Sequence, residues 1–169
     1  MFRTLLVNVI CVSAAWALMP ALLGAEEIRE LSIIASAYDS PVEASIGPVQ
    51  LNEQGGVVIR GVEELVAMSG RPDSAKDAAL QKELEAELAK VLAVPTIDWS
   101  KQMVLALRGQ TGTKLDRIQF ESLKAEGKVL TVAWKVKQRP PHAGLGFPVS
   151  LILVERFDDE VKFVEQGRK

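Results

Sequence analysis

The stretch Asp116–Lys137, DRIQFESLKAEGKVLTVAWKVK, contains two runs in which apolar and polar side chains alternate. A period of two is typical of a β-strand that buries one face and leaves the other in water. The apolar members of the two runs are Ile118, Phe120, Leu130, Val132, Trp134 and Val136. Between the runs, Ala125–Lys128 contains a glycine and is short enough for a tight turn. The stretch therefore predicts a β-hairpin with one apolar face.

Two continuous apolar runs, Met103–Leu107 and Val149–Val154, lie on either side of this predicted hairpin. Their length suits strands that are covered on both faces. Asp158–Asp159 indicates a turn that leads into a last strand at Val161–Val164. Consecutive strands joined by short turns predict a mainly antiparallel sheet.

The N-terminal half contains further extended segments with turn signals between them. Leu31–Ala35 is a strand candidate, and Asp39–Pro41 indicates a turn. Val49–Leu51 and Val57–Arg60 flank a loop that contains two glycines, a pattern that suggests a hairpin.

Two helices are predicted between these strands. Gly61–Gly70 suggests a short helix ended by glycine, and a long helix is expected from about Ala75 to Ala93, stopped by Pro95. Asp73 or Ser74 is the predicted N-cap of the long helix. Its apolar stripe consists of Leu80, Leu84, Leu88, Val91 and Leu92. The predicted fold class is α+β: a mainly antiparallel β-sheet, as a sandwich or open barrel, with one long and one short helix packed on it.

The first 25 residues carry one cation, Arg3, and then an apolar run from Leu5 to Leu23 that ends at Ala25. This pattern is typical of a secretory signal peptide. A retained N-terminal anchor is the alternative, because the run approaches the ~20 residues that span a bilayer. We expect cleavage, no membrane span after it, and a single α+β domain over residues 26–169 that is periplasmic or secreted.

Composition limits both the means of stabilisation and the class of partner. The only cysteine is Cys11, within the predicted signal peptide, so the exported domain must be stable without disulfides. The chain has 20 basic and 22 acidic side chains and no basic cluster. This balance argues against nucleic acid as a partner.

Two glycine-containing segments resemble nucleotide loops only superficially. Arg108–Lys114 lacks the spacing of a phosphate loop and is followed by a predicted strand rather than a helix. Gly144-Leu-Gly146 is followed by Phe147-Pro148 and another strand, so it also fails the dinucleotide pattern. We therefore expect no cofactor.

His142 is the only histidine of the chain, and it lies in the stretch Gln138–Pro148. No cysteine nucleophile remains after export, and no nucleophile-elbow motif is present. A metal site at His142 would need carboxylates alone as its other ligands, which is uncommon. We expect no catalytic residues and no metal, and we interpret Gln138–Pro148 as a stiff connection within a sheet.

The order of several short motifs resembles the C-terminal domain of PrcB-like proteins, exported proteins named for a subunit of a bacterial surface protease complex. The motifs are Val58-Ile59-Arg60, Glu63-Glu64-Leu65, Ile97–Val104, Leu107-Arg108-Gly109, Thr111-Gly112, Pro140-Pro141 and Pro148. The resemblance covers about residues 57–164, and it departs from the family at Thr111–Lys114, where a second glycine and an aromatic residue are missing. It implies a non-catalytic domain that associates with or stabilises a protease.

Two loops are the candidate binding elements, because prolines pre-set the backbone and reduce the entropy lost on docking. The candidate residues are Thr111, Gly112, Pro140, Pro141, His142, Gly144, Gly146 and Phe147. Alternatively, the prolines only end one strand and begin the next. The predicted function is protein binding, with an exported protease as the partner. The alternatives are a protease inhibitor that inserts these loops into an active site, and a small-ligand-binding or hydrolytic domain.

Overall fold

A computed structural model of the chain describes residues 28–40, 56–69, 77–108, 116–138 and 149–167. The strands are β1 (Arg29–Glu30), β2 (Ile33–Ser40), β3 (Gly56–Ile59), β4 (Gln102–Arg108), β5 (Asp116–Glu126), β6 (Val129–Gln138), β7 (Val149–Glu155) and β8 (Glu160–Glu165). The helices are α2 (Val62–Met68) and α3 (Ala78–Val91).

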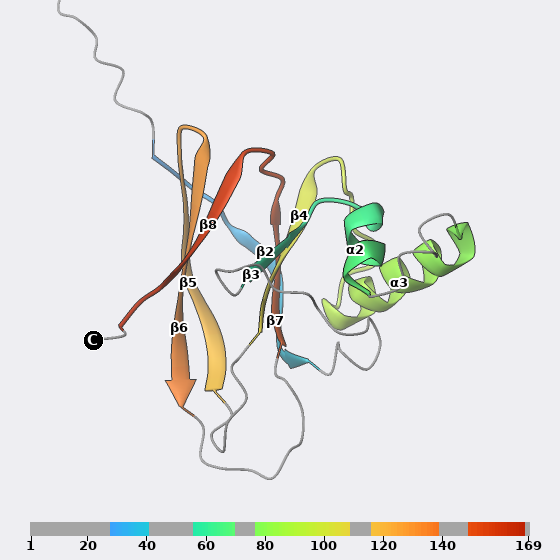
Figure 1. The fold of residues 1–169 in the computed structure, drawn as a ribbon, viewed down its shortest axis with the longest axis horizontal. Coiled ribbons are helices and arrows are strands. Elements are labelled where there is room, and N and C mark those ends of the chain that lie inside the picture. Colours follow the sequence, from blue (N-terminus) through green and yellow to red (C-terminus); the bar gives the residue numbers. More distant parts are fainter. Residues whose placement is uncertain (1–27, 41–55, 70–76, 109–115, 139–148, 168–169) are drawn as a thin grey trace, which may run out of the picture.

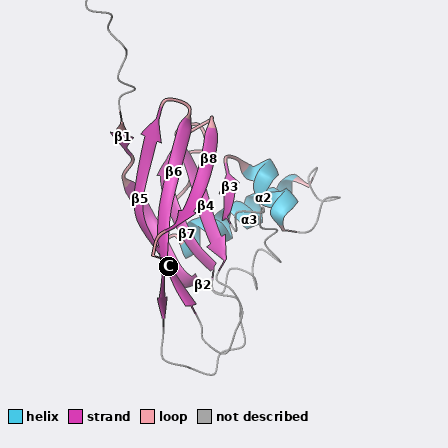
Figure 2. Cartoon of the chain, turned by 60° about the vertical axis from the view of Figure 1, so that its left-hand side comes forward, coloured by secondary structure: helices cyan, strands magenta, loops and turns pink. Residues whose placement is uncertain are grey.

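The described strands form two four-stranded sheets. Sheet A has the order β1-β5-β6-β8, and sheet B has the order β2-β7-β4-β3. Sheet B lies between sheet A and the two helices, so the molecule has three layers (Figure 1). Figure 2 shows both helices on one side of the strands. The predicted α+β class, mainly antiparallel with a long and a short helix packed on a sandwich, is confirmed.

The β5–β6 hairpin is confirmed, with one irregularity that the alternation did not indicate. Gly127 begins its two-residue turn at φ 54°, a backbone angle that glycine adopts without strain. The register shifts between Phe120 and Ser122. This β-bulge places Leu123 on the buried face, because one extra residue reverses the side-chain alternation beyond it.

Strand β4 shows why the central runs are apolar throughout. Val104 and Ala106 belong to the core between sheet B and the helices. Met103, Leu105 and Leu107 belong to the core between the two sheets. Both faces are buried, as the sequence predicted for β4 and for β7.

The two connections that follow β4 and β6 run from one sheet to the other. β4 and β7 belong to sheet B, whereas β5 and β6 belong to sheet A. The interpretation of Gln138–Pro148 as a connection within a sheet is therefore wrong. Alternation shows that a strand has a buried face, but it does not show which sheet the strand joins.

Two features of β8 depend on how distant segments pack together, and the local sequence did not indicate them. β8 pairs in parallel with β6, although the other described strand pairs are antiparallel. β8 is an edge strand of sheet A and β3 is an edge strand of sheet B, and Phe163 of β8 lies over Gly56 of β3. A Cβ at Gly56 would lie 2.6 Å from the Phe163 ring. The edges of the two sheets therefore meet at this contact.

The long helix begins later than predicted. α3 starts at Ala78, and the Asp77 carboxylate accepts hydrogen bonds from the amides of Ala79 and Leu80. The caps predicted at Asp73 and Ser74 are therefore wrong for this helix. Both positions lie outside the described residues.

The end of α3 confirms the helix stop predicted before Pro95. The Val94 amide donates to the Ala89 carbonyl at 3.0 Å, and the Ala93 amide donates to the Lys90 carbonyl at 3.1 Å. These bonds form a Schellman motif. Ala93 has φ 55°, at the position where glycine is usual.

Strand β2 continues beyond its predicted end. It runs to Ser40, so the turn predicted at Asp39–Pro41 does not begin at Asp39. The predicted strand Val49–Leu51 lies outside the described residues. No helix in the described ranges is long and apolar enough to cross a bilayer. The predicted signal peptide, residues 1–25, lies outside those ranges.

Candidate functional site

The eight candidate loop residues all lie outside the described residues, in the ranges 109–115 and 139–148. They are Thr111, Gly112, Pro140, Pro141, His142, Gly144, Gly146 and Phe147. The strands on either side of each range are described: β4 and β5 flank the first, and β6 and β7 flank the second. The positions of these four strand ends are therefore known.

Those four strand ends are paired with one another. Arg108, the last residue of β4, is the register partner of Val149, the first residue of β7. Asp116, the first residue of β5, is the register partner of Gln138, the last residue of β6. All four ends lie at the same end of the sandwich (Figure 1). Both candidate segments are therefore anchored at one end of a rigid scaffold.

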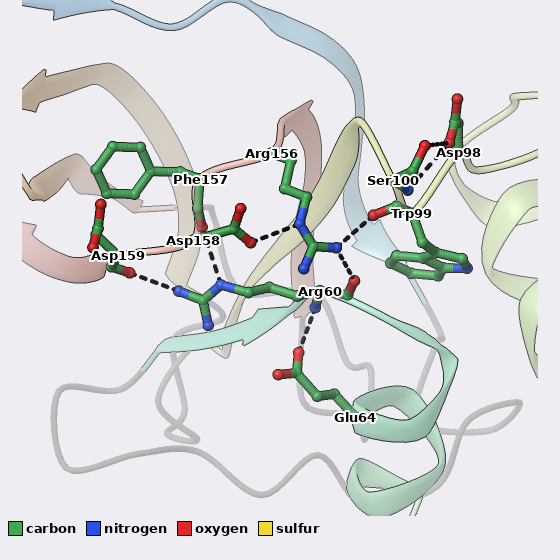
Figure 3. Close-up of polar contacts among 9 residues, drawn as sticks. All are labelled: Arg60, Glu64, Asp98, Trp99, Ser100, Arg156, Phe157, Asp158 and Asp159. Atoms are coloured by element: carbon green, nitrogen blue, oxygen red, sulfur yellow. Dashed lines mark hydrogen bonds and ion pairs between the residues drawn. The ribbon is translucent and has the colours of Figure 1, made fainter.

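A second cluster contains motif residues that are described. Arg60 follows β3, and its side chain reaches the connection between β7 and β8 (Figure 3). Its Nε donates to the Phe157 carbonyl at 3.0 Å, and its Nη2 donates to the Asp159 carbonyl at 2.8 Å. Arg60 thus holds the turn that transfers the chain from sheet B to sheet A.

Arg156 lies in the same cluster, in the β7–β8 connection, and donates back to the segments that follow β3 and precede β4. Its Nη1 donates to the Arg60 carbonyl at 2.8 Å and to the Trp99 carbonyl. Its Nε donates to Asp158 Oδ1 at 2.6 Å. The planar guanidinium group suits this role because it can donate to several acceptors in fixed directions.

The start of α2 is fixed by a side chain of its own first turn. Gly61 is the N-cap and provides no side-chain oxygen. Instead, Glu64 Oε2 accepts a hydrogen bond from the Arg60 amide. The glutamate therefore satisfies an amide beside the positive end of the helix dipole.

The turn before β4 is built around Asp98. Asp98 Oδ1 accepts from the amide and the hydroxyl of Ser100, at 3.1 and 2.5 Å. The hydrogen bond from the Ser100 hydroxyl is the main reason that the pKa of Asp98 is lowered, and the nearby Lys101 ammonium contributes. Trp99 Nε1 donates to Glu85 Oε1 at 2.9 Å, which ties this turn to α3.

These contacts give the resemblance motifs a structural explanation. Arg60, Glu64 and the run Asp98–Ser100 come from three different motifs, and they meet where both sheets and the helices join. Their hydrogen-bond partners are mainly backbone groups at strand and helix ends, which need partners of their own. The cluster can therefore hold the architecture together.

Arg156 is the member of this cluster that sequence analysis missed. The signal was weak: a single cation directly after a buried strand and two residues before an acidic turn. Within the described ranges, no group of three or more histidine, cysteine or acidic side chains is placed to hold a metal ion.

Comparison with protein-family models, with curated proteins and with solved structures finds no match to this chain.

Proposed function

We propose that this chain is an exported, non-catalytic domain that binds another protein, and that its partner is a secreted protease. The observation that carries the proposal is the pairing of Arg108 with Val149 and of Asp116 with Gln138. Because of this pairing, the glycine-containing segment 109–115 and the proline- and glycine-containing segment 139–148 start from one end of the sandwich. Loops presented side by side at one end of a rigid β-scaffold are a common arrangement for binding.

The scaffold beneath these segments supports a contact role. β4 and β7 are buried on both faces, so the ends that carry the loops are held firmly. Proline lowers the entropy that a loop loses when it docks, and Phe147 supplies an apolar side chain for the contact. The resemblance to PrcB-like domains is the reason for proposing a protease rather than another partner.

Affinity purification of the exported protein from its native envelope tests the proposal. We expect the wild-type protein to recover a protease in a constant ratio. Phe147→Ser should reduce this recovery at least fivefold. Val164→Ser should not, because Val164 is 45% exposed on β8, away from the β4, β5, β6 and β7 ends. Equal recovery by both variants, or no protease at all, would contradict the proposed site.

The activity and lifetime of the recovered protease distinguish a stabilising subunit from an inhibitor. A stabilising subunit should lengthen the lifetime of the protease and leave peptide hydrolysis unchanged. An inhibitor should abolish hydrolysis at equimolar concentration.

A further inference from the structure

Strands β1 and β2 are two parts of one extended segment that passes from sheet A to sheet B. Only Leu31 and Ser32 separate them, and the Leu31 amide donates to the Leu123 carbonyl at 2.9 Å. The described residues expose four large apolar side chains, and three belong to this segment: Ile28, Ile33 and Ile34. Ile34 is 52% exposed. Exposed large apolar side chains are thus concentrated in this segment, which makes it a candidate for contact with another chain.

β2 is also an edge strand in the described part of the chain, where its sheet partner is β7 alone. From Ile33 to Tyr38 it contains no charged residue and no proline, and its one charged residue is Asp39, next to the last residue of the strand. Edge strands usually carry such residues because they prevent pairing with another chain.

The other edges of the two sheets are protected. β1 is only two residues long. β8 carries Glu160 and Lys162, and the start of β3 is covered by Phe163. Among the described edges, β2 is therefore the one whose composition permits pairing with a further strand.

The register of β2 indicates which partner fits. Its ladder with β7 is irregular between Ile33 and Ala35 and between Ala37 and Ser40, and it is regular over Ala35–Ala37. A twofold axis at Ser36 would place Ala35 opposite Ala37 of a second copy. It would also place Ile34 opposite Tyr38 of that copy. No like charges oppose each other in this register, as a self-complementary interface requires.

We propose that two copies of this chain associate through antiparallel pairing of their β2 strands, centred on Ser36. The pairing joins the two B sheets into one eight-stranded sheet and buries Ile34 of each copy. The second copy fits because it supplies an extended strand that is uncharged from Ile33 to Tyr38 and carries its own exposed isoleucines, while its Asp39 lies opposite Ile33 and not opposite another charge. This interface is separate from the loop end proposed to bind a protease, and neither proposal depends on the other.

Sedimentation equilibrium of the exported protein, expressed with its own N-terminus and purified as the cell processes it, tests the association. We expect the mass of two chains for the wild-type protein and of one chain for Ile34→Lys, because the substitution places a charge where the association would bury an apolar side chain. Val164→Lys is the matched control, since it adds the same charge at an exposed apolar position on β8. It should keep the mass of two chains. Circular dichroism confirms that each variant is folded.

Disulfide trapping gives a second readout that removes no apolar contact. Directly opposed residues of an antiparallel pair have Cβ atoms about 4.5–5.5 Å apart, close to disulfide geometry. In a Cys11→Ser background, Ser36→Cys should therefore form linked dimers on mild oxidation. Lys162→Cys, at an exposed position of β8, should not.

Three results would overturn the proposal. One is a single-chain mass at every soluble concentration of the wild-type protein. Another is a two-chain mass that Ile34→Lys leaves unchanged, with no linkage through Ser36→Cys. The third is a single chain bound to a different protein whose binding Ile34→Lys abolishes, because β2 would then serve another partner.

Discussion

β6 and β7 are consecutive strands, yet their surroundings differ completely. β7 lies in sheet B, and every residue from Val149 to Val154 is buried. β6 lies in sheet A, where Leu130 and Val132 are buried while Thr131 and Lys135 on the other face are partly exposed. A layer covers both faces of sheet B, whereas sheet A has its core on one face only.

This difference explains the two sequence patterns as consequences of layer position. A central strand of the middle layer, such as β4 or β7, is apolar along its covered length, because those side chains do not reach water. A strand in an outer layer must be apolar only at alternate positions. Ser150 is the polar exception in β7, and its hydroxyl donates to the Ile118 carbonyl at 3.0 Å. A buried hydroxyl is thus satisfied by the neighbouring sheet.

The largest expected effect comes from removing a side chain of the middle layer. Leu105 is fully buried between the sheets, so Leu105→Ala should lower the free energy of unfolding by about 3 kcal/mol. Val164→Ala, on the outer face of sheet A, should lower it by less than about 0.5 kcal/mol. Urea unfolding followed by tryptophan fluorescence measures both. Similar losses would contradict the difference between the layers.

The contact between the sheet edges is the next test. Gly56→Ala places a Cβ 2.6 Å from the ring of Phe163, so we expect a loss of about 1–3 kcal/mol in unfolding free energy. Gly61→Ala is the matched control, because no atom lies within 4 Å of its added Cβ. Phe163→Leu should partly rescue Gly56→Ala in the double variant. Additive losses without rescue would show that β3 and β8 do not meet as described.

A smaller loss is expected where Arg156 links both sheets to the turn before β4. Arg156→Lys keeps the charge and loses the fork that reaches the Arg60 and Trp99 carbonyls. We expect a loss of about 1–2 kcal/mol. Arg29→Lys, which alters an exposed pair with Glu155, should shift Tm much less. Thermal unfolding measures both, and equal shifts in Tm would contradict a structural role specific to Arg156.

The features that could be predicted from the sequence are those that depend on the periodic spacing of apolar residues. The hairpin, the two doubly buried strands and both helices follow from the spacing of apolar residues, which reports how many faces of an element are buried. The N-cap was missed because Asp73, Ser74 and Asp77 are all good capping residues. Local preference does not choose among them.

Arrangements that join distant segments could not be predicted in this way. Arg156 and Arg60 are 96 positions apart, and only the packing of two sheets brings them together. The parallel pairing of β6 with β8 and the crossing of the β6–β7 connection between sheets have the same origin. The candidate loops lie outside the described residues, so their binding role stays a prediction that rests on the strand ends and the resemblance.

The smallest expected effect concerns the exposed turn that leads into β4, where stability should depend on pH. Hydrogen bonds from Ser100 lower the pKa of Asp98 below its ordinary value of 3.8. A lowered pKa in the folded state means that the carboxylate stabilises the fold above this value. The stabilisation is lost as the pH falls through the lowered pKa. Asp98→Asn should therefore reduce Tm slightly at neutral pH, and its difference from the wild type should shrink below pH 3.8.

Ser100→Ala separates this local effect from general acid unfolding. It removes the hydroxyl that is the main cause of the lowered pKa, while the ion pair between Lys101 and Asp98, at 3.5 Å, remains. In the Ser100→Ala background, Asp98→Asn should show a much smaller pH-dependent change in Tm. An unchanged pH dependence would assign it instead to the backbone amide of residue 100 and to Lys101. Because the turn is exposed, either result should leave the change in stability at Asp98 well below the loss caused by Leu105→Ala. Stability therefore depends mainly on sheet B, the layer that is covered on both faces.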